Sequence, residues 1–225
     1  MTTSISNATP RDLLADIDAR IALGGRHVMG FVGAPGAGKS TLVEALHAAR
    51  PLTTCIVPMD GFHLAQCSLE RLGRAARKGA SDTFDAEGYV RLLERIRAQR
   101  RGSGPIYAPA FDRHLEDAIA SSIEISADIC VVLTEGNYLL LDDAPWRDVR
   151  GLLDACWYVD VVPTLRRERL LARHVAHGRS SADASAWVES TDEPNARRIE
   201  ATRHRATGVV RIVHSGDDGI DADAR

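Results

Sequence analysis

Lysine is almost absent from this sequence. Of its 28 lysine and arginine residues, only Lys39 and Lys78 are lysine, and the other 26 are arginine. A coding bias toward arginine is the simplest cause. Under such a bias, a lysine is expected to persist where a compact ammonium with three rotatable donors is needed and a planar guanidinium does not fit. Both lysines are therefore candidates for function, and chance survival on a solvated loop is the alternative for Lys78.

Cysteine and long apolar runs are also scarce. The four cysteines form neither a CxxC pair nor a Cys/His metal pattern, so they are expected to be reduced thiols in a reducing compartment. Residues 1–7 are polar without an apolar signal core, and the apolar runs are far shorter than the roughly 18 residues of a membrane span. We therefore expect a cytoplasmic protein that makes no membrane contact.

The net charge of −3 gives no general attraction to nucleic acid. Arginine is nevertheless dense in 91–101 and in 166–179. The first group alternates with apolar positions of a predicted helix and is most simply its solvated side. We expect no nucleic-acid partner, whereas a homodimer is possible.

The segment 33–40 reads GAPGAGKS and lies between the apolar run 27–32 and the helix-like segment 41–46. In such a loop the glycines turn backbone N–H groups toward phosphates, Lys39 reaches the β and γ phosphates, and Ser40 holds Mg²⁺. The positive end of the following helix adds to the same site. An ordinary turn is the alternative, but the place between strand and helix favours a site for ATP and Mg²⁺. The predicted nucleotide-binding residues of this loop are Gly33, Ala34, Pro35, Gly36, Ala37, Gly38, Lys39, Ser40 and Thr41.

Strand-like and helix-like segments alternate along the chain, without an internal repeat or a linker. This alternation predicts an α/β fold with one doubly wound parallel sheet in a single domain, 1–225. An irregular loop is expected at 72–84, and a hairpin or irregular excursion at 104–127. The expected strands are 27–33, 53–58, 129–134, 156–162 and 209–213. Helices are expected between Thr9 and Gly24, at 39–49, around the apolar residues from Tyr89 to Ile96, at 164–177 and around 183–206.

Two acidic residues directly follow apolar strands. Ligands of such sheets bind beyond the carboxyl ends of the strands, so Asp60 and Glu135 are expected at the same rim as the phosphate loop. Glu135 is a candidate for holding the metal directly or through water, with a simple strand-end charge as the alternative. Asp60 is a candidate general base or orienter of an acceptor hydroxyl, with a turn aspartate before glycine as the alternative.

Several motifs together resemble the uridine kinase, pantothenate kinase and phosphoribulokinase branch of the P-loop kinases. The resemblance spans most of the chain and extends to a bacterial nucleoside/nucleotide kinase family, some of whose members are proposed to be kinases linked to fructose transport. It implies a P-loop nucleoside triphosphate hydrolase (kinase) fold with a helical lid at about 164–195. The motifs are GAPGAGKST at 33–41, MDGFHL at 59–64, RKGASDTFD at 77–85, YAPAFDR at 107–113, TEGNYLLL at 134–141 and the arginine-rich helix 166–179.

The resemblance also implies residue roles. In that family the aspartate matching Asp60 is implicated as the catalytic base, and the glutamate matching Glu135 supports Mg²⁺. Arginines of the lid clamp the phosphates in that family, and we assign this role to Arg169, Arg173 and Arg179. The catalytic residues implied beside Asp60 are Lys39, Arg169 and Arg173. A solvated arginine face is the alternative for the lid. The sequence MDGF is like pantothenate kinase, whereas the chain length is nearer to uridine kinase, so the acceptor stays open.

Further residues near these motifs are candidates for binding the acceptor. Each has a structural alternative: a helix cap for His63, a packed aromatic with a surface ion pair for Tyr107 and Arg113, and a core position for Tyr138. The three tryptophans Trp146, Trp157 and Trp187 are expected to be packing residues. The predicted substrate-binding residues are Asp60, His63, Lys78, Tyr107, Arg113, Asn137 and Tyr138.

The leading functional prediction is an ATP-dependent kinase that transfers a phosphoryl group to a hydroxyl of a small metabolite such as a sugar, a nucleoside or a pantothenate-like compound. A nucleoside monophosphate kinase is an alternative that keeps the same chemistry. A regulatory GTPase or ATPase is a second alternative. A guanine-selective NKxD element needs a lysine, and the only lysine after Lys39 is Lys78, which is followed by Gly79-Ala80-Ser81 without the aspartate. No LSGGQ signature is present either.

Overall fold

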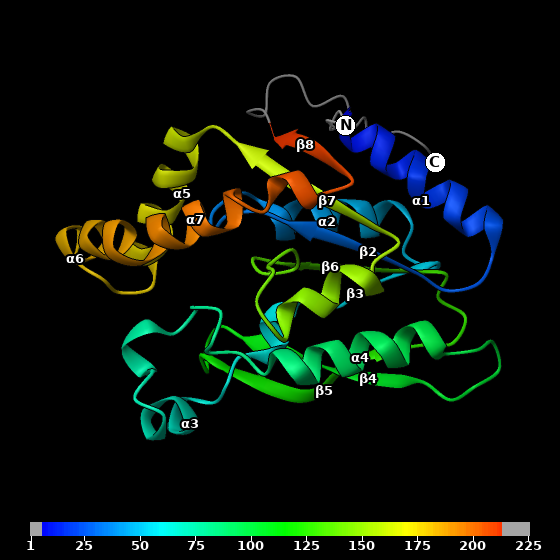
Figure 1. The fold of residues 1–225 in the computed structure, drawn as a ribbon, viewed down its shortest axis with the longest axis horizontal. Helices are drawn as coiled ribbons and strands as arrows, with labels where there is room; N and C mark the ends of the chain where they lie inside the picture. The colour runs from blue at the N-terminus through cyan, green and yellow to red at the C-terminus, as the bar shows by residue number, and fades with distance from the viewer. Residues whose placement is uncertain (1–5, 213–225) are drawn as a thin grey trace.

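The computed structural model describes residues 6–212, which form an α/β fold around a six-stranded parallel sheet (Figure 1). The strand order is β1-β8-β7-β2-β6-β3, and all neighbouring strands run parallel. The predicted doubly wound parallel sheet is thus confirmed. The strands are β1 (Ser6–Ala8), β2 (His27–Val32), β3 (Thr54–Ile56), β6 (Val131–Gly136), β7 (Ala155–Val161) and β8 (Gly208–Ile212).

The central strands are apolar because helices cover both faces of the sheet. Every residue of β6 is buried. In β2 the side chains alternate between two cores: Met29 and Phe31 pack with α1 (Pro10–Leu23) and α2 (Lys39–Ala49). Val28 and Val32 pack on the opposite face with α4 (Ala86–Ala98) and the 3₁₀ helix η3 (Trp146–Leu152). Figure 1 shows α1 and α4 on opposite sides of the sheet.

The limits of α1 follow from local chemistry. Thr9 and Asp12 form a reciprocal capping box at its start, where Pro10 occupies the first helical position. At the other end, Gly24 caps the helix with a φ of 71°, a left-handed value that favours glycine. These signals lie within a few residues of each helix end, which is why the sequence predicts them well.

The excursion at 104–127 is an antiparallel hairpin of β4 (Ile106–Asp112) and β5 (Asp117–Ile125), one of the two predicted alternatives. The expected irregular loop at 72–84 contains only the 3₁₀ turn η2 (Ala75–Arg77), and the short helix α3 (Gln66–Arg71) precedes it. The edge strand β1 was missed. Of the predicted last strand, residue 213 lies outside the described residues.

The predicted lid region is broken into several short helices. After α5 (Pro163–Ala176) the chain forms α6 (Ser181–Trp187), a π-helical turn η4 (Val188–Asp192), α7 (Glu193–Glu200) and the 3₁₀ turn η5 (Arg203–Arg205). The prediction of helical sequence around 183–206 is therefore confirmed, although a π-helical turn interrupts the α-helical geometry. In Figure 1 these helices gather at one end of the sheet. Among residues 6–212, no helix combines the length and apolar character needed to span a membrane.

Candidate active site

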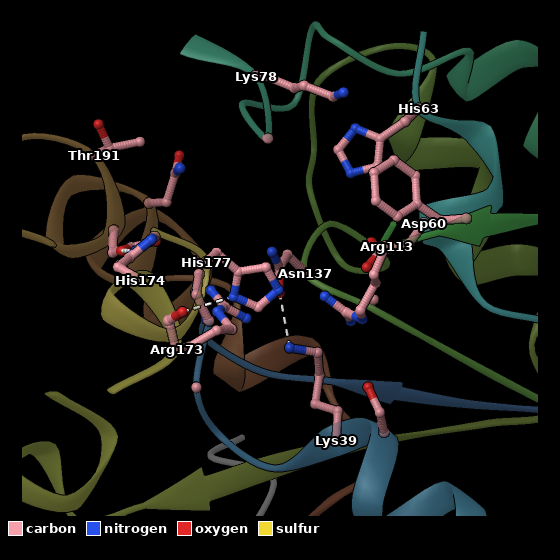
Figure 2. A pocket seen from close by; sticks show the side chains of 18 of the residues that line it. Lys39, Asp60, His63, Lys78, Arg113, Asn137, Arg173, His174, His177 and Thr191 are labelled. Atoms are coloured by element: carbon pink, nitrogen blue, oxygen red, sulfur yellow. Dashed lines mark hydrogen bonds and ion pairs between the residues drawn. The ribbon is translucent and has the colours of Figure 1, made fainter. Parts of the chain in front are cut away.

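A cavity of about 880 Å³ opens at the carboxyl ends of β2 and β6 (Figure 2). Its floor is the phosphate loop, one wall is formed by the 3₁₀ turn η1 (Met59–Phe62) and the β4–β5 hairpin, and the opposite wall by the lid. The predicted site residues that line it are Pro35, Gly36, Gly38, Lys39, Ser40, Thr41, Asp60, His63, Lys78, Arg113, Glu135, Asn137, Arg169, Arg173 and Arg179.

The phosphate loop needs glycine for two separate reasons. Gly36 and Gly38 have φ values of 80° and 88°, in the left-handed region. A Cβ on Gly33 would lie 2.7 Å from the carbonyl oxygen of Val159, so β7 leaves no room for a side chain. Gly38 is also the N-cap of α2, and the first turn of this helix therefore points its free N–H groups into the cavity.

Lys39 is buried in this floor, with 8% of its surface exposed. Its ammonium donates hydrogen bonds to the side-chain oxygen of Asn137 at 2.8 Å and to the carbonyl of Ala34 at 3.2 Å. Burial lowers the pKa of Lys39, and the nearby carboxylates of Glu135 and Asp60 oppose that shift. The ammonium is thus held between the loop and the end of β6.

Ser40 and Glu135 form a pair of oxygen donors beside Lys39. The hydroxyl of Ser40 donates to Oε1 of Glu135 at 2.9 Å. Burial raises the pKa of Glu135, whereas the ammonium of Lys39 acts in the opposite direction. Hydroxyl and carboxylate oxygens are the ligand type that Mg²⁺ prefers, so these two residues fit the predicted metal role chemically.

Asp60 and His63 come from η1 and the residue after it. The half-buried imidazole of His63 lies between the rings of Phe84 and Phe111, with centroid distances of 4.0 and 4.8 Å. Burial lowers the pKa of His63 to about 4, and the carboxylate of Asp60 partly counteracts this effect. The histidine is therefore neutral at physiological pH. Its buried Nδ1 has no hydrogen-bond partner among the described residues.

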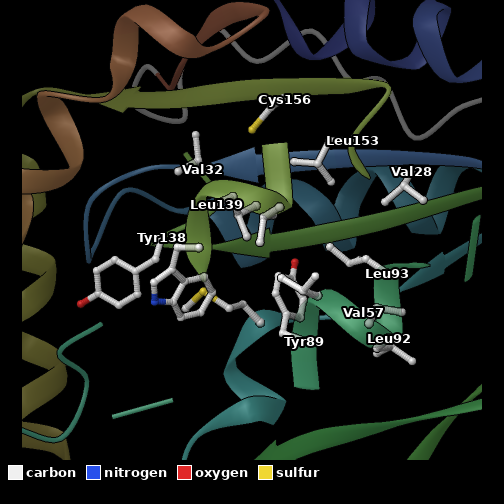
Figure 3. Packing of buried hydrophobic residues seen from close by; sticks show 14 of the residues in the cluster. Val28, Val32, Val57, Tyr89, Leu92, Leu93, Tyr138, Leu139, Leu153 and Cys156 are labelled. Carbon is white, nitrogen blue, oxygen red and sulfur yellow. The ribbon is translucent and has the colours of Figure 1, made fainter. Parts of the chain in front are cut away.

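Two substrate-binding predictions are not supported by the structure. The Tyr107 ring is 47% exposed and its hydroxyl donates to Glu124 within the hairpin, away from the cavity. Alternation along β4 explains this, because Ile106 and Ala108 point inward and the residue between them must point to solvent. Tyr138 is fully buried in the aromatic part of the core and does not line the cavity (Figure 3).

Tyr138 nevertheless affects the site indirectly. Its hydroxyl donates to the carbonyl of Gly79 at 2.5 Å, while the indole of Trp146 donates to the carbonyl of Ser81 at 2.9 Å. Both bonds anchor the loop that carries Lys78 onto the core. The ammonium of Lys78 donates to the carbonyl of Glu116 and lies 5.4 Å from the centroid of the Phe111 ring. The loop and the hairpin thus meet at the cavity.

The lid contacts the phosphate loop through Arg166. This buried arginine forms an ion pair with Glu193 at 2.5 Å, and its backbone oxygen lies 2.9 Å from where a Cβ of Gly36 would be. Arg169 and Arg173 lie on the same helix and line the cavity. One terminal nitrogen of Arg169 comes within 3.2 Å of the Cβ position at Gly38. Arg169 is thus brought to the phosphate loop, and all three predicted lid arginines line the same cavity.

Two features of the lid were missed from the sequence. Trp187, expected to be a packing residue, lines the cavity, and the guanidinium of Arg179 lies 3.9 Å from the centroid of its indole ring. In addition, Nε2 of His174 lies 2.7 Å from a carboxylate oxygen of the buried Asp192. Asp192 is presented by the π-helical turn, which no local sequence pattern announces.

These observations define a class of protein. A phosphate loop before a helix, a buried acid at the end of the neighbouring strand and an arginine-bearing lid over one cavity are the parts of a P-loop phosphotransferase.

Comparison with known proteins identifies the family. No family model matches the sequence. The chain is 37% identical over 152 residues to the ATP-dependent kinase-like protein notR' of Aspergillus versicolor, covering 64% of this chain and 88% of the relative. It is 35% identical over 179 residues to a Schizosaccharomyces pombe protein proposed to be a uridine kinase, covering 74% of each. A crystal structure of a proposed fructose transport system kinase from Silicibacter sp. TM1040 matches with a TM-score of 0.80 at 36% identity, over 92% of this chain and 100% of that one.

The chain belongs to the P-loop kinases of the uridine kinase and phosphoribulokinase branch. It is accordingly an ATP-dependent kinase, as the sequence predicted.

Proposed function

We propose that this protein transfers the γ-phosphoryl group of ATP to a hydroxyl group of a small metabolite. The observation that carries the proposal is the presence of Asp60 in the same cavity as the phosphate loop. Its carboxylate is near enough to oppose the lowering of the Lys39 pKa by burial and to add to the raising of the Glu135 pKa. A carboxylate in this place can orient an acceptor hydroxyl and accept its proton while the phosphoryl group is transferred.

The remaining residues supply binding and charge. The backbone N–H groups of the phosphate loop hold the phosphates, and the ammonium of Lys39 stabilises the charge that develops on the transferred group. Arg169 and Arg173 face the same space from the lid and would neutralise the outer phosphate oxygens. Arg179, stacked on Trp187, would close the nucleotide side.

Mg²⁺ is part of the proposal. Ser40 and Glu135 would hold it, directly or through water, and it would neutralise charge on the β and γ phosphates. Within the described residues, no group of three or more His, Cys, Asp or Glu side chains is placed to hold a metal ion. The other ligands would therefore be phosphate oxygens and water, as is usual for Mg²⁺ in nucleotide sites.

The protein is proposed to act in the cytoplasm. The four cysteines are free in the structure, and Cys67 is exposed. Burial raises the pKa of the Cys156 thiol to about 12, so this sulfur stays protonated and unreactive. Free thiols suit a reducing compartment.

An ATP-consumption screen tests the proposed function. The panel contains sugars, sugar phosphates, hydroxy acids, nucleosides, pantothenate and nucleoside monophosphates, with water as the blank. We expect one class of hydroxyl compound to raise ATP consumption. With that acceptor, Asp60→Asn should lower kcat by about 10²–10⁴-fold while calorimetry shows nearly unchanged ATP affinity. An unchanged kcat would show that Asp60 is a turn residue without a catalytic role. Turnover of nucleoside monophosphates alone would show that the protein is a nucleoside monophosphate kinase.

A further inference from the structure

Two basic side chains, Lys78 and Arg113, line the acceptor side of the cavity. Among residues 6–212, neither Lys78 nor Arg113 forms an ion pair, although both line the cavity. The contrast lies within the same loop, where Arg74 and Arg77 both pair with Asp82. The ammonium of Lys78 donates to the backbone carbonyl of Glu116 and not to its carboxylate. Two of its three donors therefore stay available.

The two cations lie on either side of His63. Arg113 ends the β4 side of the hairpin, and Lys78 follows η2 in the facing loop. Both add to the lowering of the His63 pKa by burial, and Arg113 opposes the raising of the Glu135 pKa beside the phosphate loop. Figure 2 shows Arg113 beside Asp60, with Lys78 on the far side of His63.

Close packing keeps this wall in place. A Cβ on Gly61 would lie 2.3 Å from the carbonyl oxygen of Pro109, so η1 and the hairpin are in direct backbone contact. Phe111 then contacts both His63 and Lys78. The hairpin that carries Arg113 is thus held against η1, and Lys78 contacts the same hairpin through Phe111 and Glu116.

The lid supplies its own arginines for the nucleotide. Arg169 and Arg173 lie on α5, which contacts the phosphate loop through Arg166, on the wall opposite the hairpin. Lys78 and Arg113 lie on the other wall, on the side of Asp60. A neutral acceptor would remove water from two cations without providing a counter-charge, which is unfavourable. An anionic group would form charge-assisted hydrogen bonds with both.

We propose that the phosphoryl acceptor carries an anionic group, a carboxylate or a phosphate monoester, which Lys78 and Arg113 bind while its hydroxyl is directed at Asp60. This inference rests on the proposed kinase function and narrows it to small anionic hydroxy compounds. Hydroxy acids and sugar phosphates share this chemistry, whereas free sugars and nucleosides lack it.

Matched pairs of acceptors test the inference. Glycerate and several sugar phosphates are compared with glycerol and the corresponding free sugars in the ATP-consumption assay. We expect kcat/KM to be at least about tenfold higher for the charged member, and the preferred charged group distinguishes a carboxylate from a phosphate. Lys78→Gln and Arg113→Gln should raise KM for that acceptor by about tenfold or more, the range of a lost charge-assisted hydrogen bond. The control Arg77→Gln, next to Lys78 but paired with Asp82, should stay within about twofold.

Equal use of charged and neutral members would overturn the inference and leave the proposed function intact. If no panel member is used, inorganic phosphate becomes the probe. It is titrated by calorimetry into protein saturated with Mg²⁺ and a non-hydrolysable ATP analogue, so that the phosphate loop is already filled. Binding that Lys78→Gln weakens about tenfold, with Arg77→Gln unchanged, would support the anion site even though the panel had not supported transfer to a hydroxyl group. Absent binding, or equal binding in all three proteins, would overturn it.

Discussion

At the scale of single residues, Lys39 shows why the nearly lysine-free composition is informative. Its ammonium fits between the carbonyl of Ala34 and the side chain of Asn137, a space that a planar guanidinium would fill differently. Lys39→Arg should fold normally and lose about 10²-fold or more in kcat, because the charge is no longer centred on the transferred group. Circular dichroism checks the fold and steady-state kinetics the turnover. Near wild-type turnover would show that this loop is not catalytic in the proposed way.

His63 provides a test by pH. Its pKa is about 4 in the folded protein, below the ordinary value of 6.5, chiefly because of burial. Between these two values the unfolded chain binds more protons than the folded one, so the free energy of unfolding should rise as the pH increases from about 4 to 6.5. His63→Gln should flatten that rise in urea titrations, whereas His114→Asn, at an exposed position of the hairpin turn, should not. A slope identical in wild type and His63→Gln would contradict the burial of a neutral histidine.

At the scale of elements, the sequence predicts what is encoded locally. The phosphate loop, Glu135 near the end of β6, Asp60 in η1 and the ends of α1 all depend on neighbours within a few positions. The missed parts depend on distant contacts. Strand β1 exists because it pairs with β8, about 200 residues away, and only the pairing of the hairpin shows that Tyr107 points outward. The role of Trp187 was missed because a π-helical turn and Arg179 place it at the cavity.

The contact between η1 and the hairpin predicts how a small change would disturb the acceptor wall. Gly61→Ala places a methyl group 2.3 Å from the Pro109 carbonyl oxygen, so the hairpin must move away from Asp60. We expect a stability loss of about 1–3 kcal/mol, typical of overpacking, and a raised acceptor KM with nearly unchanged ATP affinity. Gly104→Ala is the matched control, since a Cβ there meets nothing within 4 Å. Unchanged stability and KM in Gly61→Ala would mean that the hairpin adjusts freely.

At the scale of the whole molecule, the charge of the cavity is opposite to that of the chain. The chain carries a net charge of −3, which on its own would repel a nucleotide. The cavity, however, is lined by six lysine or arginine residues (Lys39, Lys78, Arg113, Arg169, Arg173 and Arg179) and by four acids (Asp60, Glu116, Glu135 and Asp192). Fields inside a cleft act on a ligand more strongly than distant surface charges, which salt screens beyond about 10 Å at 0.1 M ionic strength.

The net charge of the chain and the charge of the cavity predict opposite effects of salt on the rate of ATP association. If the net charge dominates, added salt should speed association by screening repulsion. We expect the cavity to dominate, so the association rate of a fluorescent ATP analogue in stopped flow should fall by about tenfold between 50 mM and 0.5 M NaCl. Arg173→Gln should reduce that dependence, because its guanidinium lines the cavity. Arg211→Gln, an exposed position paired with Asp160, removes the same charge elsewhere and should leave the dependence unchanged. An association rate that rises with salt, or equal effects of both substitutions, would show that the cavity charge does not guide the nucleotide.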